Sequence, residues 1–451
     1  MIKVKNIQGI LSLLPAAAFF LGIAAALSTL PLYGVSGIYD RIGIIPEHGL
    51  HGAVPEENID LFTGNLTLRF QDIRLPGPNG FDTVVWRVYN SKIQKDRLPG
   101  SAWGMQQDPY SWVGIMQQDP YSWVGMGWSM HMGIVHNYLS TEPVIEFPDG
   151  RFETAYPNNS DSYYYTRDFL RYDKTNYKLY FKDGTVWTFG LSKTIVIQGI
   201  SESVRVVTSI ENSYGHTISV MYQSGSLPEM KSITDSLGRT INFILTGDCL
   251  SRISVKNTTG TLVYYDYTVG TFSNSGYYKL TGYDPPEIAA STYEYDTGLY
   301  DRYELTAVNT SYGGRFEYSY VNHTFYFYVQ SLDTRVVSQK KMRTAAAAAF
   351  NTWTYTYPTY LNTGTGTVTV DGPVYDTNVT YHAYSSASPW KIGLISKKSF
   401  SDGSYSEETL WTYREISYLT WLVLNVNLGT IKAPLIQKSI VTRLGDAEST
   451  E

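Results

Sequence analysis

Apolar and polar residues alternate along much of the chain, and this alternation predicts β-strands. Asn65–Ile73 reads NLTLRFQDI, in which two leucines and a phenylalanine alternate with threonine, arginine and glutamine. Such alternation places one set of side chains on each face of a sheet. A turn at Pro76–Gly80 leads to a second predicted strand at Thr83–Tyr89. The one notable helix candidate, Thr344–Phe350 (TAAAAAF), has at most two turns. The pattern therefore predicts an all-β fold.

Tyrosines recur two residues apart in the predicted strands. The pairs are Tyr163/Tyr165, Tyr265/Tyr267, Tyr293/Tyr295, Tyr318/Tyr320, Tyr326/Tyr328 and Tyr355/Tyr357. Residues i and i+2 of a strand share a face, where aromatic neighbours across strands add about 0.2–1 kcal/mol per pair. The spacing indicates sheet packing first. A surface that stacks on sugar rings would use the same residue types, so that alternative stays open.

An imperfect repeat runs from about residue 210 to residue 320. Its copies start at Ile210, Ile233, Ile253, Leu280 and Leu305. Each copy has an apolar strand, a polar turn and a second strand that ends in aromatic residues. In four of the five copies glycine closes the turn, at Gly215, Gly238, Gly260 and Gly313-Gly314. Asn and Asp before the glycine suit the positive-φ positions of hairpin turns. Each copy thus predicts a β-hairpin, and because one hairpin is marginal alone, the copies are expected to stack edge to edge.

A second duplication is exact in its first ten residues. MQQDPYSWVGI at Met105–Ile115 is followed at once by MQQDPYSWVGM at Met116–Met126. The copy shows no strand alternation, so we interpret it as a slippage insertion in a loop, which folded proteins tolerate well.

The first 33 residues indicate export. Lys3 and Lys5 precede an almost charge-free apolar run, Ile10–Leu32, and the small residues Ala24 and Ala26 suit a signal peptidase. The run is also long enough, at more than ~20 residues, for an uncleaved membrane anchor. A buried helix is the third alternative.

Composition excludes two classes of protein. The 451 residues include 35 Lys+Arg against 41 Asp+Glu, and 39 tyrosines contribute to an aromatic content of 15%. The mild acidity excludes a globally basic nucleic-acid binder, and the aromatic content excludes a wholly disordered chain. Cys249 is the only cysteine, so the chain has no intramolecular disulfide.

Candidate chemistry is sparse. The sequence has no HExxH, GxSxG or GxxxxGK[ST] motif. His48 and His51 fall in a predicted loop, and the spacing of His131 and His136 predicts opposite faces of a strand, whereas a metal site needs three or four converging ligands. Carboxylate pairs could serve glycoside hydrolysis only at a suitable separation; the candidates are Glu142, Glu146, Glu287, Glu294, Glu407 and Glu408. We therefore assign no catalytic, cofactor-binding or metal residue and expect no cofactor.

Three acid-glycine pairs resemble fragments of calcium loops. They are Asp149-Gly150, Asp183-Gly184 and Asp402-Gly403, and none belongs to a D-x-D-x-D-G series. We predict tight hairpin turns at these positions.

Several segments together resemble the RHS/YD-repeat family of large bacterial secreted or surface polypeptides. They are Asp60–Ser91, Gly125–Gly133, Glu146–Pro157, Tyr177–Gly190 and the repeats ITDSLGRTINF and LVYYDYTVG, with weaker likeness at Gly393–Ser404. The resemblance covers about residues 46–320. It implies a spiralling β-sheet that can close into a shell around a C-terminal toxic or variable domain, and other members act in cell-surface or carbohydrate contact.

The chain departs from the full family pattern, because it has no aspartate-proline-glycine self-cleavage signature and no recognisable effector domain. It therefore resembles an N-terminal portion. We expect a signal peptide or anchor at 1–33, a β-rich domain at 34–139, RHS/YD-like repeats at 140–330 and a divergent, incomplete β region at 331–451.

The expected function is that of a non-enzymatic, secreted or cell-surface scaffold, part of a toxin-encapsulating or adhesive shell. The alternative is a carbohydrate-binding module that uses exposed Tyr and Trp; a secreted hydrolase is a third hypothesis. Expected partners are a C-terminal effector or continuation polypeptide and a cell-surface glycan. Nucleic acid is not expected, and membrane contact is expected only through an uncleaved N-terminal segment.

Overall fold

The computed structural model is nearly all β, which confirms the predicted fold class. It describes residues 43–450 except 53, 55, 93–121, 141, 159–160, 198–199, 274–276, 297–302, 328–329, 360–363, 384, 386–387, 422–425 and 444–445. The predicted signal or anchor at 1–33 lies outside these residues. Helical structure in the described part is confined to the short 3-10 turns η3 (Pro46–His48), η4 (Pro78–Gly80) and η6 (Pro389–Lys391). None of the helices among the described residues has the length and apolar character needed to cross a bilayer.

An inner sheet of four antiparallel strands forms first along the chain. Its order is β1 (Glu57–Ile59), β2 (Leu66–Leu75), β3 (Thr83–Asn90) and β4 (Trp128–Ser129). The strands predicted at 65–73 and 83–89 are β2 and β3. The turn between them contains η4, where Asn79 takes a positive φ of 55°.

A second sheet has five strands. It contains β5 (Ile134–His136), β6 (Val144–Glu146), β7 (Phe152–Thr154), β13 (Leu191–Ile197) and β14 (Ile200–Val206), in the order β13-β14-β5-β6-β7.

The remaining strands form one large antiparallel sheet whose strand order closes on itself. The strands are β8 (Tyr156–Pro157), β9 (Tyr164–Tyr165), β10 (Arg171–Asp173), β11 (Lys178–Tyr180), β12 (Val186–Thr188), β15 (Ser209–Glu211), β16 (Thr217–Tyr222), β17 (Met230–Thr234), β18 (Thr240–Thr246), β19 (Cys249–Lys256), β20 (Leu262–Thr271), β21 (Tyr278–Asp284), β22 (Ser291–Tyr295), β23 (Leu305–Asn309), β24 (Arg315–Phe327), β25 (Gln330–Arg343), β26 (Asn351–Thr356), β27 (Thr365–Asp371), β28 (Thr377–His382), β29 (Ile395–Phe400), β30 (Tyr405–Trp421), β31 (Val426–Arg443) and β32 (Asp446–Thr450).

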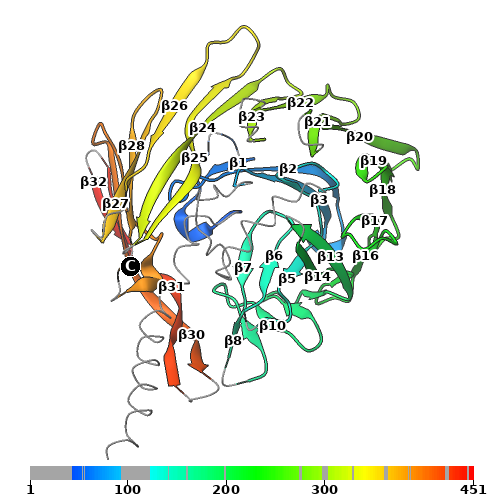
Figure 1. Ribbon diagram of the computed structural model, residues 1–451, viewed down its shortest axis with the longest axis horizontal. Helices are drawn as coiled ribbons and strands as arrows, with labels where there is room; N and C mark the ends of the chain where they lie inside the picture. The colour runs from blue at the N-terminus through cyan, green and yellow to red at the C-terminus, as the bar shows by residue number, and fades with distance from the viewer. Residues whose placement is uncertain are drawn as a thin grey trace, which may run out of the picture.

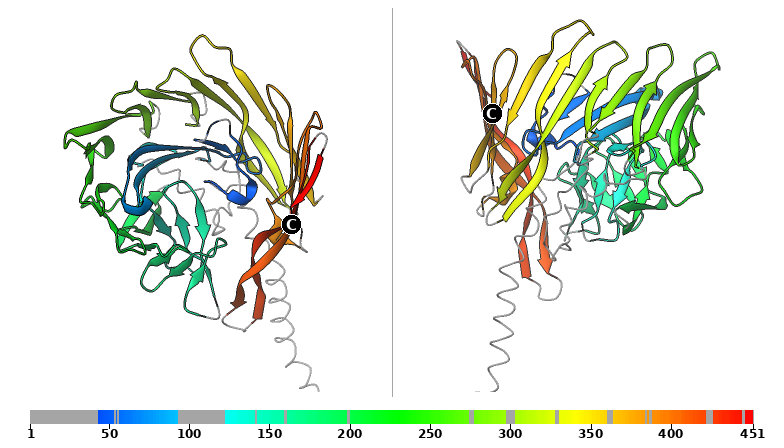
Figure 2. Two further views of the ribbon diagram at one scale, coloured as in Figure 1. Left: turned by 180° about the vertical axis from the view of Figure 1, so that it is seen from behind. Right: turned by 45° about the horizontal axis from the view of Figure 1, so that its top comes forward.

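The large sheet curves around the inner sheet. In Figure 1 its strands follow the outline of the molecule from β8 and β10 through β16–β20 and β24 to β32, and β1–β3 lie inside the curve. The left view in Figure 2, seen from behind, again shows the inner strands, in blue, within the curve of the large sheet. Near the end of the circuit, β30 contacts β8. The main hydrophobic core fills the space between the concave face of the large sheet and the inner sheet.

The five repeat copies are consecutive hairpins of the large sheet, as predicted. They form the strand pairs β15–β16, β17–β18, β19–β20, β21–β22 and β23–β24. The predicted turn glycines Gly215, Gly238, Gly260 and Gly313 have φ near 80°. The Asn or Asp does not take the positive φ that we expected of it. It lies three residues before the glycine, and its side chain accepts backbone N–H groups of the turn, as Asn212 does from Tyr214 and His216.

The acid-glycine pairs are hairpin turns, also as predicted. Gly150, Gly184 and Gly403 all have positive φ and connect β6 to β7, β11 to β12 and β29 to β30.

The helix prediction at Thr344–Phe350 is wrong. This segment forms a turn between β25 and β26, with a single Ala348 N–H to Ala345 C=O hydrogen bond of 3.0 Å. Seven residues are too few to offset helix nucleation, and the two antiparallel strands require the chain to reverse direction. The pairing of the strands overrides the helix propensity of alanine.

The second copy of the exact duplication ends in the core. Residues 93–121 lie outside the described part, but Trp123, Val124 and Met126 are buried, and the Trp123 ring lies 5.8 Å from that of Phe243. The end of this copy is therefore a packing segment, which the interpretation as loop filler missed.

Deleting Met105–Ile115 is expected to leave stability unchanged, because the intact second copy still supplies the buried Trp123 segment. Thermal unfolding followed by circular dichroism checks this, with Trp123→Ala in the full chain as the comparison. Trp123→Ala is expected to cost about 3–5 kcal/mol. A large fall in the melting temperature of the deletion variant would contradict the loop-insertion interpretation.

Candidate functional site

Six of the buried charged or imidazole side chains of the described chain lie at the contact between the inner sheet and the concave face of the large sheet. We call this contact the seam. Two of its pairs are ion pairs, Arg87–Asp72 and Lys340–Glu57, and a third joins the imidazole of His48 to the carboxylate of Asp60. The side chains of all three pairs are nearly inaccessible to solvent. Each pair also contacts a tyrosine of the large sheet.

The Arg87–Asp72 pair lies at the centre of the seam. Arg87 on β3 donates from Nε to Asp72 Oδ2 (2.9 Å) and from Nη2 to Oδ1 (3.1 Å). Asp72 occupies a β-bulge in β2, between the registers of Gln71 and Ile73, and a bulge of this kind re-aims a side chain. The sheet geometry thus brings an aspartate onto the apolar face, beneath the guanidinium.

Tyrosines of the large sheet complete this pair. Arg87 Nη1 donates to the Tyr293 hydroxyl (2.7 Å), and the Tyr267 hydroxyl donates to Asp72 Oδ2 (2.8 Å). The guanidinium carbon lies 4.5 Å from the Tyr283 ring centroid and 5.0 Å from that of Trp128. A cation over aromatic faces gains electrostatic attraction, most of all when desolvated. Burial raises the pKa of both hydroxyls, so they stay protonated.

The Lys340–Glu57 pair joins β25 of the large sheet to β1. Tyr318 donates its hydroxyl to Glu57 Oε1 (2.7 Å), and the Lys340 ammonium lies 4.8 Å from the Trp353 ring centroid. Burial lowers the pKa of Lys340, and the neighbouring Glu57 carboxylate opposes that shift.

The His48–Asp60 pair closes the seam near β28. His48 Nδ1 lies 2.8 Å from Asp60 Oδ2, and because a carboxylate only accepts, Nδ1 is the donor. Burial alone would raise the pKa of Asp60, but His48 and the N–H groups of Phe62 and Thr63 lower it. The Tyr381 hydroxyl donates to the His48 carbonyl (2.9 Å). His48 lies in η3 and is hydrogen-bonded within the fold.

The paired tyrosines mostly face the core. Tyr267, Tyr293, Tyr295, Tyr318, Tyr355 and Tyr357 are buried, while Tyr163, Tyr165, Tyr265 and Tyr320 are half-buried. Tyr328 and the side chain of Tyr326 lie outside the described part. Tyr264, one position out of phase, is 43% exposed. The packing interpretation is therefore confirmed for the pairs at 265/267, 293/295, 318/320 and 355/357, all of whose members pack in or against the core.

Several tyrosine hydroxyls also have a role that the spacing did not predict. Tyr222, Tyr295 and Tyr320 each donate to a backbone carbonyl exactly 15 residues earlier, at 2.7 to 2.9 Å. The acceptors are Val207, Leu280 and Leu305. Tyr357 reaches Val337 in the same way. These bonds cross a hairpin, from its second half back to its first strand or to the residues just before it, as Tyr295 on β22 bonds to Leu280 on β21. A tyrosine recurring at a fixed distance after an apolar strand start is the sequence signal that could have revealed them.

His131 and His136 converge instead of pointing to opposite faces. His131 Nε2 lies 3.0 Å from Glu146 Oε1, and His136 Nε2 lies 2.8 Å from Glu146 Oε2. The alternation fails because His131 precedes the strand and Gly133, with φ of 131°, breaks the extended conformation. Burial would raise the pKa of Glu146, but the two imidazoles lower it to about 2.

The hydrogen bonds of this cluster fix the tautomer of His131. The Gly133 N–H donates to His131 Nδ1 (3.0 Å), so His131 carries its proton on Nε2 and donates it to the carboxylate. Among the described residues, no group of three or more His, Cys, Asp or Glu side chains could hold a metal ion.

Most of the candidate carboxylates of the hydrolase hypothesis have hydrogen-bond or ion-pair partners of their own. Glu294 pairs with Arg315, Glu408 pairs with Lys397, and Glu407 accepts from Tyr405 and Ser439. Glu142 has a pKa raised by burial, and Glu287 lies in a turn with φ of 70°.

Cys249 begins β19 and is half-buried. Burial, Asp248 and Glu229 raise the pKa of its thiol to about 11. The thiol is therefore protonated at neutral pH, which does not suit a nucleophile.

One carboxylate outside the seam is strongly perturbed. Arg151 lies between Asp149 (3.1 Å), Glu153 (3.4 Å) and Asp168 (3.6 Å). Burial and the neighbouring Asp168 raise the pKa of Glu153 to about 7. Folding therefore favours the protonated form of Glu153 over its charged form, relative to the unfolded chain.

Glu153→Gln is expected to make the protein more stable than the wild type at pH 8 but not at pH 4. With a folded pKa of about 7 and an ordinary value of 4.5, Glu153 contributes stability below pH 4.5 that is lost as the pH rises through 7. At pH 8 the free energy of unfolding of Glu153→Gln is expected to exceed that of the wild type by about 1–3 kcal/mol. Urea unfolding of both proteins at pH 4 and pH 8 measures this difference. Glu408→Gln, at an exposed pair, is the control; equal pH profiles of wild type and Glu153→Gln would contradict the raised pKa.

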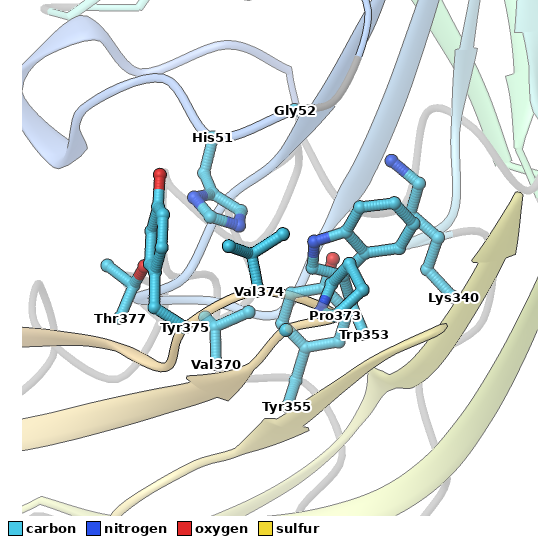
Figure 3. Close-up of a pocket in the computed structure, with 11 residues that line it drawn as sticks. His51, Gly52, Lys340, Trp353, Tyr355, Val370, Pro373, Val374, Tyr375 and Thr377 are labelled. Carbon is cyan, nitrogen blue, oxygen red and sulfur yellow. The ribbon is translucent and has the colours of Figure 1, made fainter. Parts of the chain in front are cut away.

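Two cavities open along the seam. The smaller cavity, of about 270 Å³, lies between the His51–Gly52 segment and strands β25–β28. Figure 3 shows the His51 ring projecting into it, with Tyr375 on one side and Trp353 on the other. The larger cavity, of about 700 Å³, lies between β2 and strands β20–β24.

The larger cavity has mainly aromatic and aliphatic walls, with a few neutral polar side chains and the carboxylate of Glu56. Its rings include Phe70, Tyr265, Tyr283, Phe316 and Tyr312, and Arg87 and Asp72 line it as a matched pair. Neither cavity was predicted, because their residues come from segments more than 150 positions apart.

No family model and no curated protein matches the chain. Solved structures to which it is similar include the crystal structure of TcdB2-TccC3, at 8% identity and a TM-score of 0.25, and the Tc holotoxin pore of Photorhabdus luminescens, at 6% identity and a TM-score of 0.19. These similarities cover 87% and 86% of this chain but 26% and 24% of the others, so it spans about a quarter of their length. TM-scores this low carry no argument about function, and the fold description rests on the strand pairings given above.

Proposed function

We propose that this chain is an exported, non-enzymatic β-repeat scaffold of RHS/YD type that acts through its shape, as part of a toxin-encapsulating or adhesive shell. One observation supports this above the others. In each buried pair of the seam the two side chains bind each other, and a tyrosine of the large sheet donates a hydrogen bond to one of the two residues or accepts one from it. Charges used in this way hold two sheets in one arrangement. These groups make their hydrogen bonds to other residues of the fold, which stabilises its shape and does not serve to bind a substrate.

The curvature of the large sheet supports the same function. Consecutive hairpins add to one edge of the sheet, and the strand order returns on itself around the inner sheet. The wall surrounds the inner sheet here, and a larger wall built from more hairpins of the same kind can surround another polypeptide. The proposed partner is accordingly a C-terminal effector or a continuation polypeptide.

Co-expression with the polypeptide encoded immediately downstream tests the scaffold. We expect the two to co-purify and the partner to resist a protease that degrades it when it is expressed alone. A control uses the Arg87→Met variant, which weakens the seam and is expected to reduce the protection. Separate elution of the two polypeptides, or equal rates of digestion, would count against the shell.

Export rests on the N-terminal 33 residues. The same segment is the proposed route of membrane contact, if signal peptidase does not cleave it. Expression of the full chain in a bacterial host, followed by fractionation and N-terminal sequencing, tests both points. A full-length chain that stays in the cytoplasm would contradict export.

A second candidate function is glycan binding, and the larger cavity favours it. Aromatic faces suit the apolar faces of sugar rings, and hydroxyl side chains such as Thr310 and Ser311 suit sugar hydroxyls. The Arg87–Asp72 pair is matched and Glu56 adds a further carboxylate, so the cavity disfavours an acidic saccharide and suits a neutral one. A glycan array of neutral oligosaccharides tests this.

Two exposed tyrosines in equivalent turns provide the variant and its control. Tyr312, 81% exposed, borders the larger cavity, whereas Tyr214, 73% exposed, occupies the matching position of another repeat turn. Tyr312→Ala is expected to weaken glycan binding about tenfold, and Tyr214→Ala to leave it unchanged. Absence of any binding on the array, or equal loss in both variants, would reject this candidate.

A further inference from the structure

The smaller cavity has the size and walls of a site for a single ring. Trp353, Tyr355 and Tyr375 supply aromatic walls and Val370 an aliphatic one. Its volume is about 270 Å³. An apolar cavity of about 150 Å³ already holds benzene, so this one has room for a ring with a polar substituent.

Of the two lysines near this cavity, one has a carboxylate partner and the other forms no ion pair with a described residue. Lys340 is paired with Glu57, but Lys398 on β29 forms no ion pair with any described residue. Lys398 lies opposite Val379 in the register of β28 and β29, and alternation places it on the same face of the sheet as Thr377, which lines the cavity. The carboxylate of Glu407, opposite Lys398 on β30, accepts from Tyr405 and Ser439.

His51 is held firmly at the other side of the cavity. Its backbone N–H donates to Asn58 Oδ1 (2.9 Å), and its carbonyl accepts from the Ile59 N–H (2.7 Å). The ring lies edge-on to Tyr355, with 6.2 Å between centroids, and makes no hydrogen bond within the described part of the chain. Burial, followed by the positive charges of Lys398 and Lys340, lowers its pKa to about 4.

We propose that the smaller cavity binds a small organic anion with a flat apolar body, such as an aromatic carboxylate, between Lys398, His51 and the Trp353 and Tyr375 rings. The ammonium of Lys398 matches the carboxylate, and the imidazole offers a hydrogen bond to it. The aromatic walls bury the ring of the ligand. This site is independent of the scaffold function, because a wall of a shell needs no such ligand.

Calorimetric titration of the full chain with benzoate tests the proposal, with benzamide and benzylamine as neutral and cationic ligands of the same shape and acetate as an anion without a ring. Benzoate is expected to bind at least tenfold more tightly than each of the three, because a hydrogen bond to a charged partner is stronger than one to a neutral partner. In a parallel NMR titration, saturation with benzoate is expected to raise the pKa of His51. The groups that face His51 are the ammoniums of Lys340 and Lys398, the Glu57 carboxylate beside Lys340, and the hydroxyls of Tyr355 and Tyr375.

Adjacent lysines supply the matched variants. Lys398→Gln is expected to weaken benzoate binding about tenfold, and Lys398→Arg to restore most of it. Lys397→Gln, on the opposite face and paired with Glu408 at 2.9 Å, is expected to bind like the wild type. Val374→Trp, at an exposed turn that lines the cavity, is expected to block binding without affecting the fold. Equal affinity for benzoate and benzamide, unchanged binding by Lys398→Gln, or no saturable binding of benzoate at millimolar concentrations would overturn the proposal.

Discussion

Arg87→Met lowers the free energy of unfolding by about 3–5 kcal/mol, because it leaves the Asp72 carboxylate buried without its counter-charge. The loss includes the two hydrogen bonds to Asp72, the one to Tyr293 and the attraction of the guanidinium to the rings around it. Urea unfolding at pH 7, followed by tryptophan fluorescence, measures the change. The double variant Arg87→Met/Asp72→Leu is expected to recover part of the loss, since it removes the unpaired charge.

The control is a second arginine on the same sheet. Arg74 pairs with Asp82, but its side chain is 58% exposed, so Arg74→Met is expected to cost less than about 1 kcal/mol. If both single variants lose similar stability, the seam does not hold the two sheets together. If the double variant is no better than Arg87→Met, the unpaired carboxylate is not the cause.

Lys340→Met is expected to destabilise the protein by a similar amount, about 3–5 kcal/mol at pH 7. Glu57 would remain buried beside Tyr318, with no ammonium to compensate its charge. A buried carboxylate without a partner has a raised pKa, so the penalty relative to the wild type is expected to shrink as the pH falls and Glu57 takes up a proton. Unfolding measured from pH 4 to pH 8 gives this profile.

Two further variants separate charge from packing. Lys340→Met/Glu57→Gln is expected to be more stable than Lys340→Met at pH 7 and to show little of its pH dependence. Lys397→Met, at an exposed ion pair with Glu408, is expected to change stability by less than about 1 kcal/mol. A penalty for Lys340→Met that does not depend on pH would indicate lost packing against Trp353 as its cause.

The hairpin ladder could be predicted because its signals are local. Alternation, the glycine of each turn and the recurring aromatic strand ends all act within about 25 residues, and they placed the copies at residues 210 and 233 in the correct strands. Local signals also produced the error at Thr344–Phe350, where alanine propensity gave way to strand pairing. The folded position of His131 was missed for a similar reason, since one glycine interrupts the alternation.

The seam and its cavities could not be predicted, because they join residues that are far apart in sequence. Asp72 on an otherwise apolar face and Arg87 in the strand TVVWRVY were visible as charges in unusual places. That pattern indicates a buried ion pair, but it does not reveal which tyrosines complete it. Tyr293 and Tyr318 acquire their roles only once the large sheet has curved around the inner one.

The separation of these partners has a consequence for biosynthesis. The inner sheet leaves the ribosome first, yet Arg87 finds Tyr293 only 206 residues later, and His48 finds Tyr381 only 333 residues later. At roughly 5–20 residues per second, these buried groups wait about 10 to 70 s for the residues that cover them. During translation the chain therefore carries an unfinished interior, and a chaperone or a pause in export that protects residues 57–90 would matter more to its yield than any contact in the later hairpins.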